Sequence, residues 1–211
     1  MEASADGFGG DEPRIFQARR GPRPVRSRPL PVVTRRALLL TMLSSVIVVS
    51  GLGQSPQRDE YQVKAAFLFN FAKFVEWPPD AFSDGGAPLV IGIVGNDPFG
   101  DALEQTISEK SVNNRRLEIS RLKWGQNLKG CHILFISSSE SRRTPQIIES
   151  LKGGSVLTIG EMGQFNQQGG IIHFLMEENK VRFEINATAA AQMRLKISSK
   201  LLALAKSVIG R

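Results

Sequence analysis

The sequence predicts an α/β protein, a three-layer α/β/α sandwich whose mostly parallel sheet carries an antiparallel edge hairpin. Short apolar strands alternate with helical segments between residues 56 and 160, which is typical of a parallel sheet covered on both faces. Two further strands follow, and the short polar turn at 177–180 indicates a hairpin. The chain has 211 residues, of which 41% are hydrophobic, so one domain of this class with a real core is expected.

Local signals place the individual elements. Pro56 suits the first turn of a helix capped by Ser55, and two prolines from residue 78 end that helix. Asn186 and Ser198 are expected to cap the last two helices. The predicted elements are, in order, a helix at 56–76, a strand at 89–94, a helix from Asp97 to Ser108, strands at 117–122 and 131–136, a helix at 137–152, a strand at 155–159, hairpin strands at 170–176 and 181–185, a helix from residue 187, and a last helix on which Leu201, Leu204, Ala205 and Val208 share a face.

The front of the chain differs in composition from the rest. Residues 1–34 are rich in proline and arginine without hydrophobic periodicity, so they are expected to be a disordered leader. More than half of the net charge of +7 lies in residues 1–53, and such a basic leader indicates targeting. The remaining body is only mildly basic and carries no RNA-binding or zinc-finger motif, so no nucleic-acid partner is expected.

Residues 35–53 have the pattern of a signal peptide. Arg35 and Arg36 precede an apolar run at 37–49, and small residues up to Gly53 suit cleavage after that position. The run is shorter than the roughly 20 residues that span a bilayer. The arginine pair also resembles a twin-arginine signal. The alternatives are a buried core helix and an uncleaved anchor. Export predicts a periplasmic protein with its domain at 56–209.

The predicted first helix is unusually rich in aromatic residues. At 100° per residue, one apolar line runs along it and is expected to face the core; its members are Val63, Phe67, Asn70, Phe74 and Trp77. Phe69 points elsewhere, so the helix is apolar nearly all round. Such a helix is either buried between the sheet and a second helix, such as the C-terminal one, or it presents aromatic surface to a partner.

The excess of aromatic residues motivates a partner-binding hypothesis. The residues proposed to contact another protein are Phe69, Lys73, Glu76 and Trp77. Asn70 lies on the apolar line, where an unpaired amide costs about 1–3 kcal/mol, so a structural hydrogen bond is expected for it. Asn186 is given a structural role as a helix cap.

No pattern of residues points to catalysis, a cofactor or a metal. His132 and His173 lie on apolar strands without neighbouring ligands at zinc spacing, which favours roles in the core or on the sheet. The loop at 95–100 lacks the lysine of a phosphate-binding loop, and the serines at 137–139 lack a nucleophile-elbow motif. Cys131 is interpreted as a buried hydrophobic residue. The alternative function is a periplasmic small-ligand-binding or hydrolytic protein that uses the strand ends at 95–99 and 137–139.

Several stretches resemble periplasmic proteins of the YfiR family. They lie at 61–78, 130–136, 169–174, 182–186 and 195–205, in the family's order. The resemblance implies an exported, non-enzymatic α/β domain, often a dimer. It also implies repression of a membrane diguanylate cyclase through the cyclase's periplasmic sensor domain, which lowers cyclic-di-GMP and biofilm formation. The redox-sensitive disulfides of that family have no counterpart within one molecule here, because Cys131 is the only cysteine.

Overall fold

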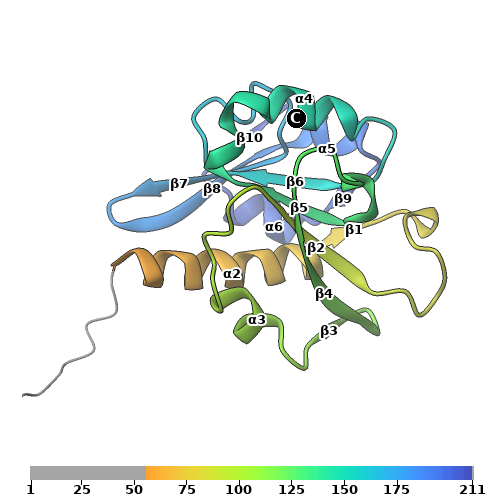
Figure 1. Ribbon diagram of the computed structural model, residues 1–211. Coiled ribbons are helices and arrows are strands. Elements are labelled where there is room, and N and C mark those ends of the chain that lie inside the picture. Colours follow the sequence, from red (N-terminus) through yellow and green to blue (C-terminus); the bar gives the residue numbers. More distant parts are fainter. Residues whose placement is uncertain (1–55, 211) are drawn as a thin grey trace, which may run out of the picture. The chain divides into compact units, whose positions relative to one another are not determined.

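The computed structural model describes residues 56–210, which include the whole predicted domain (Figure 1). The expected leader at 1–34 and signal peptide at 35–53 lie outside the described residues. Within the described part, no helix is both long and apolar enough to cross a membrane.

An eight-stranded sheet forms the centre of the domain, in the order β10-β8-β7-β6-β5-β2-β4-β3. The five strands β7, β6, β5, β2 and β4 run parallel, whereas β8 and β3 are antiparallel to their neighbours β7 and β4. This confirms the mostly parallel sheet. The strands are β2 (Leu89–Val94), β3 (Ser111–Val112), β4 (Arg115–Leu122), β5 (Ile133–Ile136), β6 (Leu157–Gly160), β7 (Ile172–Glu177), β8 (Lys180–Asn186) and β10 (Ser207–Ile209).

Helices cover both faces of the sheet, as the sandwich prediction requires. α2 (Pro56–Phe74) and α3 (Ala102–Ile107) lie on one face, and α4 (Thr144–Ser150) and α5 (Ala187–Gln192) lie on the other (Figure 1). α6 (Ser199–Leu204) contacts α2. The smaller elements are the 3-10 helices η1 (Pro79–Ala81), η2 (Leu128–Gly130) and η3 (Ser138–Arg143) and the short strands β1 (Val75–Glu76) and β9 (Lys196–Ile197).

The predicted hairpin and helix caps are confirmed in detail. Glu178 and Asn179 at the tip of the β7–β8 hairpin both have positive φ, of 49° and 58°, as a type I′ turn requires. The Asn186 side chain accepts a hydrogen bond from the backbone N–H of Ala189 at 2.9 Å. The Ser198 hydroxyl accepts one from the N–H of Leu201 at 3.2 Å. Both caps satisfy donors that the first helical turn leaves unpaired.

Two predicted helices begin later than expected. The helix expected from Asp97 starts at Ala102, because the Asp97 carboxylate accepts a hydrogen bond from the Phe99 N–H and holds a turn there. The segment after Ser137 first forms η3, and α4 begins only at Thr144, where Pro145 suits a first helical turn.

The end of the chain corrects the prediction of a long last helix. α6 stops at Leu204, whose side chain is 63% exposed, and Val208 belongs to β10 instead of the helix. β10 pairs in parallel with β8, with Val208 opposite Ile185. The predicted common face of Leu201, Leu204, Ala205 and Val208 is therefore wrong. The β-branched residues at 208–209 add a strand outside the hairpin, a pairing that helical periodicity cannot reveal.

The predicted core stripe of α2 is right only in part, because Phe67, Phe74 and Trp77 pack against the core but are not its most buried residues. The side chains that are fully or almost fully buried are Lys64, Ala65, Leu68, Phe71, Ala72 and Val75. Val63 is 45% exposed, and Phe67, Asn70, Phe74 and Trp77 are only partly buried. Because the helix is apolar nearly all round, its pattern did not fix which side faces the sheet. The helix ends at Phe74 because Val75 and Glu76 pair with β9.

Candidate functional site

The four residues proposed to bind a partner lie at the end of α2 and in the strand that follows. Phe69 is partly buried, and Lys73 is exposed with its ammonium 5.6 Å from the centre of the Phe69 ring. Glu76 is exposed on β1, opposite Lys196 of β9. Trp77 turns inward, and its indole N–H donates to the carbonyl of His132 at 3.2 Å. Partner binding by these residues stays a prediction.

Lys110 is a neighbour of this surface that the sequence did not reveal. It follows α3, and its ammonium lies 4.7 Å from the centre of the Phe69 ring. Two exposed lysines from different segments therefore meet over one aromatic ring. Attraction between an ammonium and the face of an aromatic ring is worth about 0.5–1 kcal/mol at exposed sites. Only the packing of α2 beside α3 brings these residues together.

A groove of about 240 Å³ lies beside Trp77, and its lining includes Glu76, three residues after Lys73, and Val112, two residues after Lys110. Its walls come from β1, from the loop that follows η1, and from β3 and β4; the lining residues are Val75, Glu76, Trp77, Phe82, Leu89, Val112, Asn113 and Arg115. Val112 and Asn113 come directly after the Lys110 segment. Of the four proposed binding residues, Glu76 and Trp77 line this groove, and Phe69 and Lys73 lie earlier on α2.

His132 supports the floor of this region. Its Nδ1 accepts a hydrogen bond from the Val90 N–H at 3.1 Å, so the proton must sit on Nε2, which donates to the Ala81 carbonyl at 3.1 Å. The ring stacks on Phe82 with centres 4.2 Å apart, and the Arg115 guanidinium covers the other side of this stack at 3.8 Å from the Phe82 ring. Burial lowers the pKa of His132 below its ordinary value. The predicted structural role of His132 is confirmed.

A second set of contacts holds the turn at η1, which follows Trp77, in place. The Arg194 guanidinium donates to the Asp80 carboxylate at 2.7 Å and to the Ser155 hydroxyl at 3.0 Å. Arg194 itself has a left-handed backbone, with φ of 58°, at the end of α5. These contacts join three distant segments and hold η1 beside the groove.

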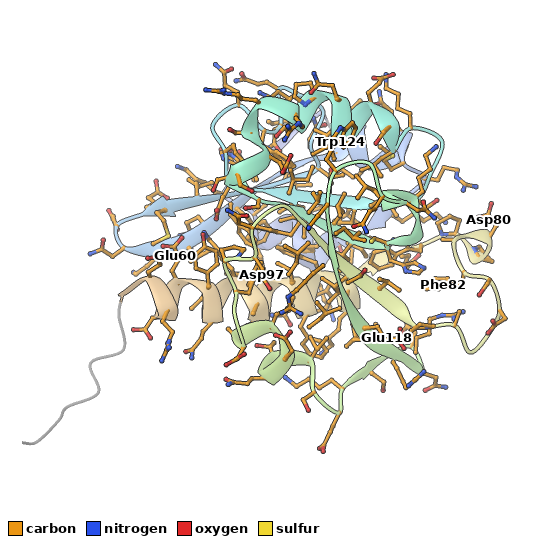
Figure 2. All side chains as sticks on the ribbon, in the orientation of Figure 1. Glu60, Asp80, Phe82, Asp97, Glu118 and Trp124 are labelled. Carbon is orange, nitrogen blue, oxygen red and sulfur yellow. The ribbon has the colours of Figure 1, made fainter. Side chains whose placement is uncertain are left out.

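A buried ionic cluster lies at the opposite end of α2. Figure 2 shows Glu60 and Asp97 at one end of the sheet, and Asp80 and Phe82 at the other. Lys64, only 3% exposed, forms ion pairs with Glu60 and with Glu161, which follows β6. The Tyr61 hydroxyl donates to Glu161 at 2.9 Å, and burial together with this carboxylate raises the pKa of Tyr61. The cluster fixes the first turns of α2 on the carboxyl ends of the strands.

Around Gly95 and Ser137–Ser139, the strand ends considered for a ligand or hydrolytic site are occupied by contacts between their own loops, whereas Pro98 and Phe99 line a cavity of about 500 Å³ beside the first turns of α2. The Ser139 hydroxyl accepts the Asn96 N–H at 2.9 Å and donates to the Ser137 hydroxyl at 3.3 Å. A Cβ at Gly95 would lie 2.4 Å from the Ser139 oxygen. Neither histidine reaches these serines, since His132 lies before the opposite end of β5 and His173 contacts Glu184.

Two further predictions concern metal ligands and the single cysteine. Among residues 56–210, no group of three or more His, Cys, Asp or Glu side chains is placed to hold a metal ion. Cys131 is buried against Gly92, and burial raises its thiol pKa to about 11. A thiol in this setting stays protonated at neutral pH and is a poor nucleophile. Its interpretation as a buried hydrophobic residue is confirmed.

Comparison with solved structures relates the fold to other α/β domains. A conserved domain protein from Vibrio cholerae O1 biovar El Tor is 11% identical with a TM-score of 0.50, and the match covers 70% of this chain and 60% of that one. An ABC domain from Streptococcus pneumoniae, solved in complex with L-Trp, is 10% identical with a TM-score of 0.45, and the match covers 73% of this chain and 60% of that one. At these identities, the first likeness concerns the fold alone.

Comparison with protein families gives a match over most of the described domain. The family described as YfiR/HmsC-like matches residues 61–206. This range begins at Tyr61 of the ionic cluster and ends at Lys206, so it includes the aromatic helix, the proposed binding residues and the whole sheet apart from β10. The resemblance seen in the sequence is thereby confirmed: the chain belongs to the YfiR/HmsC-like family.

Proposed function

We propose that this protein is an exported, non-enzymatic binding protein that represses a membrane signalling protein through the periplasmic sensor domain of that partner. The observation that carries the proposal is family membership over residues 61–206, which is consistent with a periplasmic regulator. The proposed partner is a diguanylate cyclase, so binding would lower cyclic-di-GMP and biofilm formation. The proposal includes export by the signal peptide at 35–53 and a homodimeric state.

The end of α2 is the proposed docking surface. Phe69, Lys73 and Glu76 keep exposed atoms there, and Trp77 borders the groove beside them. A partly exposed aromatic residue surrounded by charged residues is typical of the anchor positions in protein interfaces. The same surface rests on rigid supports, because Trp77 is bonded to His132 and the following turn is bonded to Arg194.

Capture of the partner from membranes tests this assignment. The full chain, tagged at its C-terminus and expressed in its own host, is recovered from detergent extracts, and bound membrane proteins are identified by mass spectrometry. Phe69→Ala and Lys73→Ala are expected to reduce recovery of the partner by about tenfold or more, as hot-spot truncations do.

Matched controls separate docking from folding. Trp124 is 42% exposed and lies on the opposite side of the domain from α2 (Figure 2), so Trp124→Ala is expected to leave capture unchanged. Lys123→Ala, at an exposed lysine directly before Trp124, serves the same purpose for charge. Unchanged capture by the Phe69 variant, with its near-ultraviolet circular dichroism intact, would remove this surface from consideration.

Cellular cyclic-di-GMP tests the regulatory part of the proposal. Deleting the gene is expected to raise cyclic-di-GMP and biofilm mass, and the wild-type chain is expected to restore both. Unchanged cyclic-di-GMP in the deletion strain would refute repression of a cyclase. The capture experiment could then still identify a different membrane partner.

A further inference from the structure

The two lysines over Phe69 carry charge that the domain itself does not neutralise. Lys64, Lys152 and Lys206 each form an ion pair with a glutamate. Within residues 56–210, Lys73 and Lys110 form none, like several other exposed lysines, but these two differ from the others because each lies over an aromatic ring. The nearby exposed residues Glu76 and Glu109 do not pair with either lysine.

Their arrangement brings two positive charges close to one apolar ring. The ammonium groups lie 5.6 Å and 4.7 Å from the centre of Phe69, so they are within about 10 Å of each other, close to one Debye length. At this separation two like charges repel weakly, and an anion placed between them is attracted by both. The ring excludes water from one side of each ammonium, which strengthens attraction to an incoming carboxylate.

The adjoining groove offers an apolar contact next to these charges. Val75 and Val112 are buried beneath it, and Trp77 is partly buried at its side. A protein segment that placed an acidic side chain between the lysines would therefore have an apolar site for a following residue. The groove itself carries both signs of charge, from Glu76 and Arg115, so the preference for an acidic side chain comes from the lysine pair, which would repel a basic one.

We propose that the partner docks here through an acidic segment, with an Asp or Glu side chain between Lys73 and Lys110 and an apolar side chain in the groove of Trp77. This inference rests on the proposed function, because it names the chemistry of the partner that the regulatory surface accepts. It adds Lys110 to the binding residues and assigns the lysine pair to recognition of carboxylates.

The partner recovered in the capture experiment supplies the probe. Its periplasmic domain is purified and titrated with the full chain by calorimetry, at low and high sodium chloride. Lys73→Glu and Lys110→Glu are each expected to weaken binding by about tenfold and to reduce its salt dependence, because each removes an attraction and adds a repulsion. Lys123→Glu makes the same change of charge beside Trp124, away from α2, and is expected to leave both unchanged.

Reversing charge on the partner sharpens the test. Exchanging the acidic residues of its docking segment for lysine is expected to abolish binding to the wild type and to restore binding to the Lys73→Glu, Lys110→Glu double variant. If the double variant binds the unaltered domain with wild-type affinity, the acidic segment is wrong, although the regulatory function stands. If wild-type protein recovers no membrane partner, the proposed function fails and this inference fails with it.

Discussion

Lys64 and Lys73 lie on the same helix, yet their surroundings are opposite. Lys64 is 3% exposed and is held between the carboxylates of Glu60 and Glu161. Lys73 is exposed, and its ammonium lies 5.6 Å from the centre of the Phe69 ring and 6.0 Å from that of Phe74. One end of α2 is therefore fixed by charges that the domain neutralises internally, and the other end presents a charge to the solvent.

The difference shows which charge belongs to the fold and which is available for recognition. A buried ammonium must be paired, since an isolated buried charge is very costly. An exposed ammonium needs no ionic partner for the fold to be stable, so the Lys73 ammonium over its aromatic ring is available to bind another protein. The two ends of one helix can then be tested separately, by measuring unfolding at the first end and partner affinity at the second.

Removing the buried charge is expected to have the largest effect on stability. Lys64→Met keeps the length of the side chain but leaves Glu60 and Glu161 side by side without a cation. Because these two carboxylates keep 24% and 15% of their side-chain exposure, the expected loss is about 2–3 kcal/mol, at or below the lower end for buried pairs. Urea unfolding followed by circular dichroism measures it. Adding Glu161→Gln is expected to recover part of the loss, and no recovery would contradict the ionic explanation.

The histidine beneath the exposed end is expected to make stability depend on pH. Burial lowers the pKa of His132 in the folded protein, so below about pH 6.5 the unfolded chain binds more protons at this residue. Its contribution is complete above pH 6.5 and is lost as the pH falls toward the folded pKa, by at most about 1.4 kcal/mol per pH unit. Comparing unfolding of the wild type and His132→Gln at pH 7 and pH 5 measures this contribution. Equal slopes in the two proteins would contradict it.

A smaller loss is expected when the phenol at the first end is removed. Tyr61→Phe deletes the hydroxyl that donates to Glu161 but keeps the ring, which packs edge-on against Phe99 with centres 5.4 Å apart. The expected cost is about 1 kcal/mol, typical of one partly buried hydrogen bond. Thermal unfolding of this variant and of the Lys64→Met protein would show whether the Lys64 ammonium or the Tyr61 hydroxyl contributes more to the stability of the cluster.

The smallest effect on stability is expected at the exposed lysine. Lys73→Met is expected to change the free energy of unfolding by less than about 0.5 kcal/mol, as most surface substitutions do. Chemical denaturation measures it under the conditions used for Lys64→Met. A loss as large as that of the Lys64 variant would show that Lys73 also stabilises the fold. It would contradict the proposed difference between the two ends of the helix.

Sequence reasoning succeeded where local signals decide the structure. The strand at 89–94 forms with the predicted bounds, and Asn186 and Ser198 cap the expected helices. The family and the fold class also followed from patterns spread along the chain. The most buried side of α2 could not be predicted in the same way. Aromatic and aliphatic residues surround that helix, and only the position of the sheet selects the side that is buried.

The candidate site depended on contacts between distant residues, which local patterns cannot predict. Lys64 and Glu161 are 97 positions apart, and the turn at Asp80 is bonded to Arg194, which is 114 positions away. Lys110 reaches Phe69 only because α3 packs beside α2. The sequence indicated that aromatic surface was in excess on α2 and named Phe69 and Lys73, but it could not identify Lys110, which meets them from another segment.

The two-residue ribbon of β1 and β9 has a consequence for the order of folding. Val75 pairs with Ile197, and the Ser198 N–H donates to the Phe74 carbonyl, so the end of the opening helix is closed by a segment close to the end of the domain. Closing a contact across more than a hundred residues costs loop entropy that a local contact does not, so we expect this ribbon to form after the local elements. A chain that ended before Leu195 would lack β9, and the aromatic residues at the end of α2 would then be exposed to unrelated proteins. Selective binding at this end of α2 therefore requires that the chain be synthesised past β9.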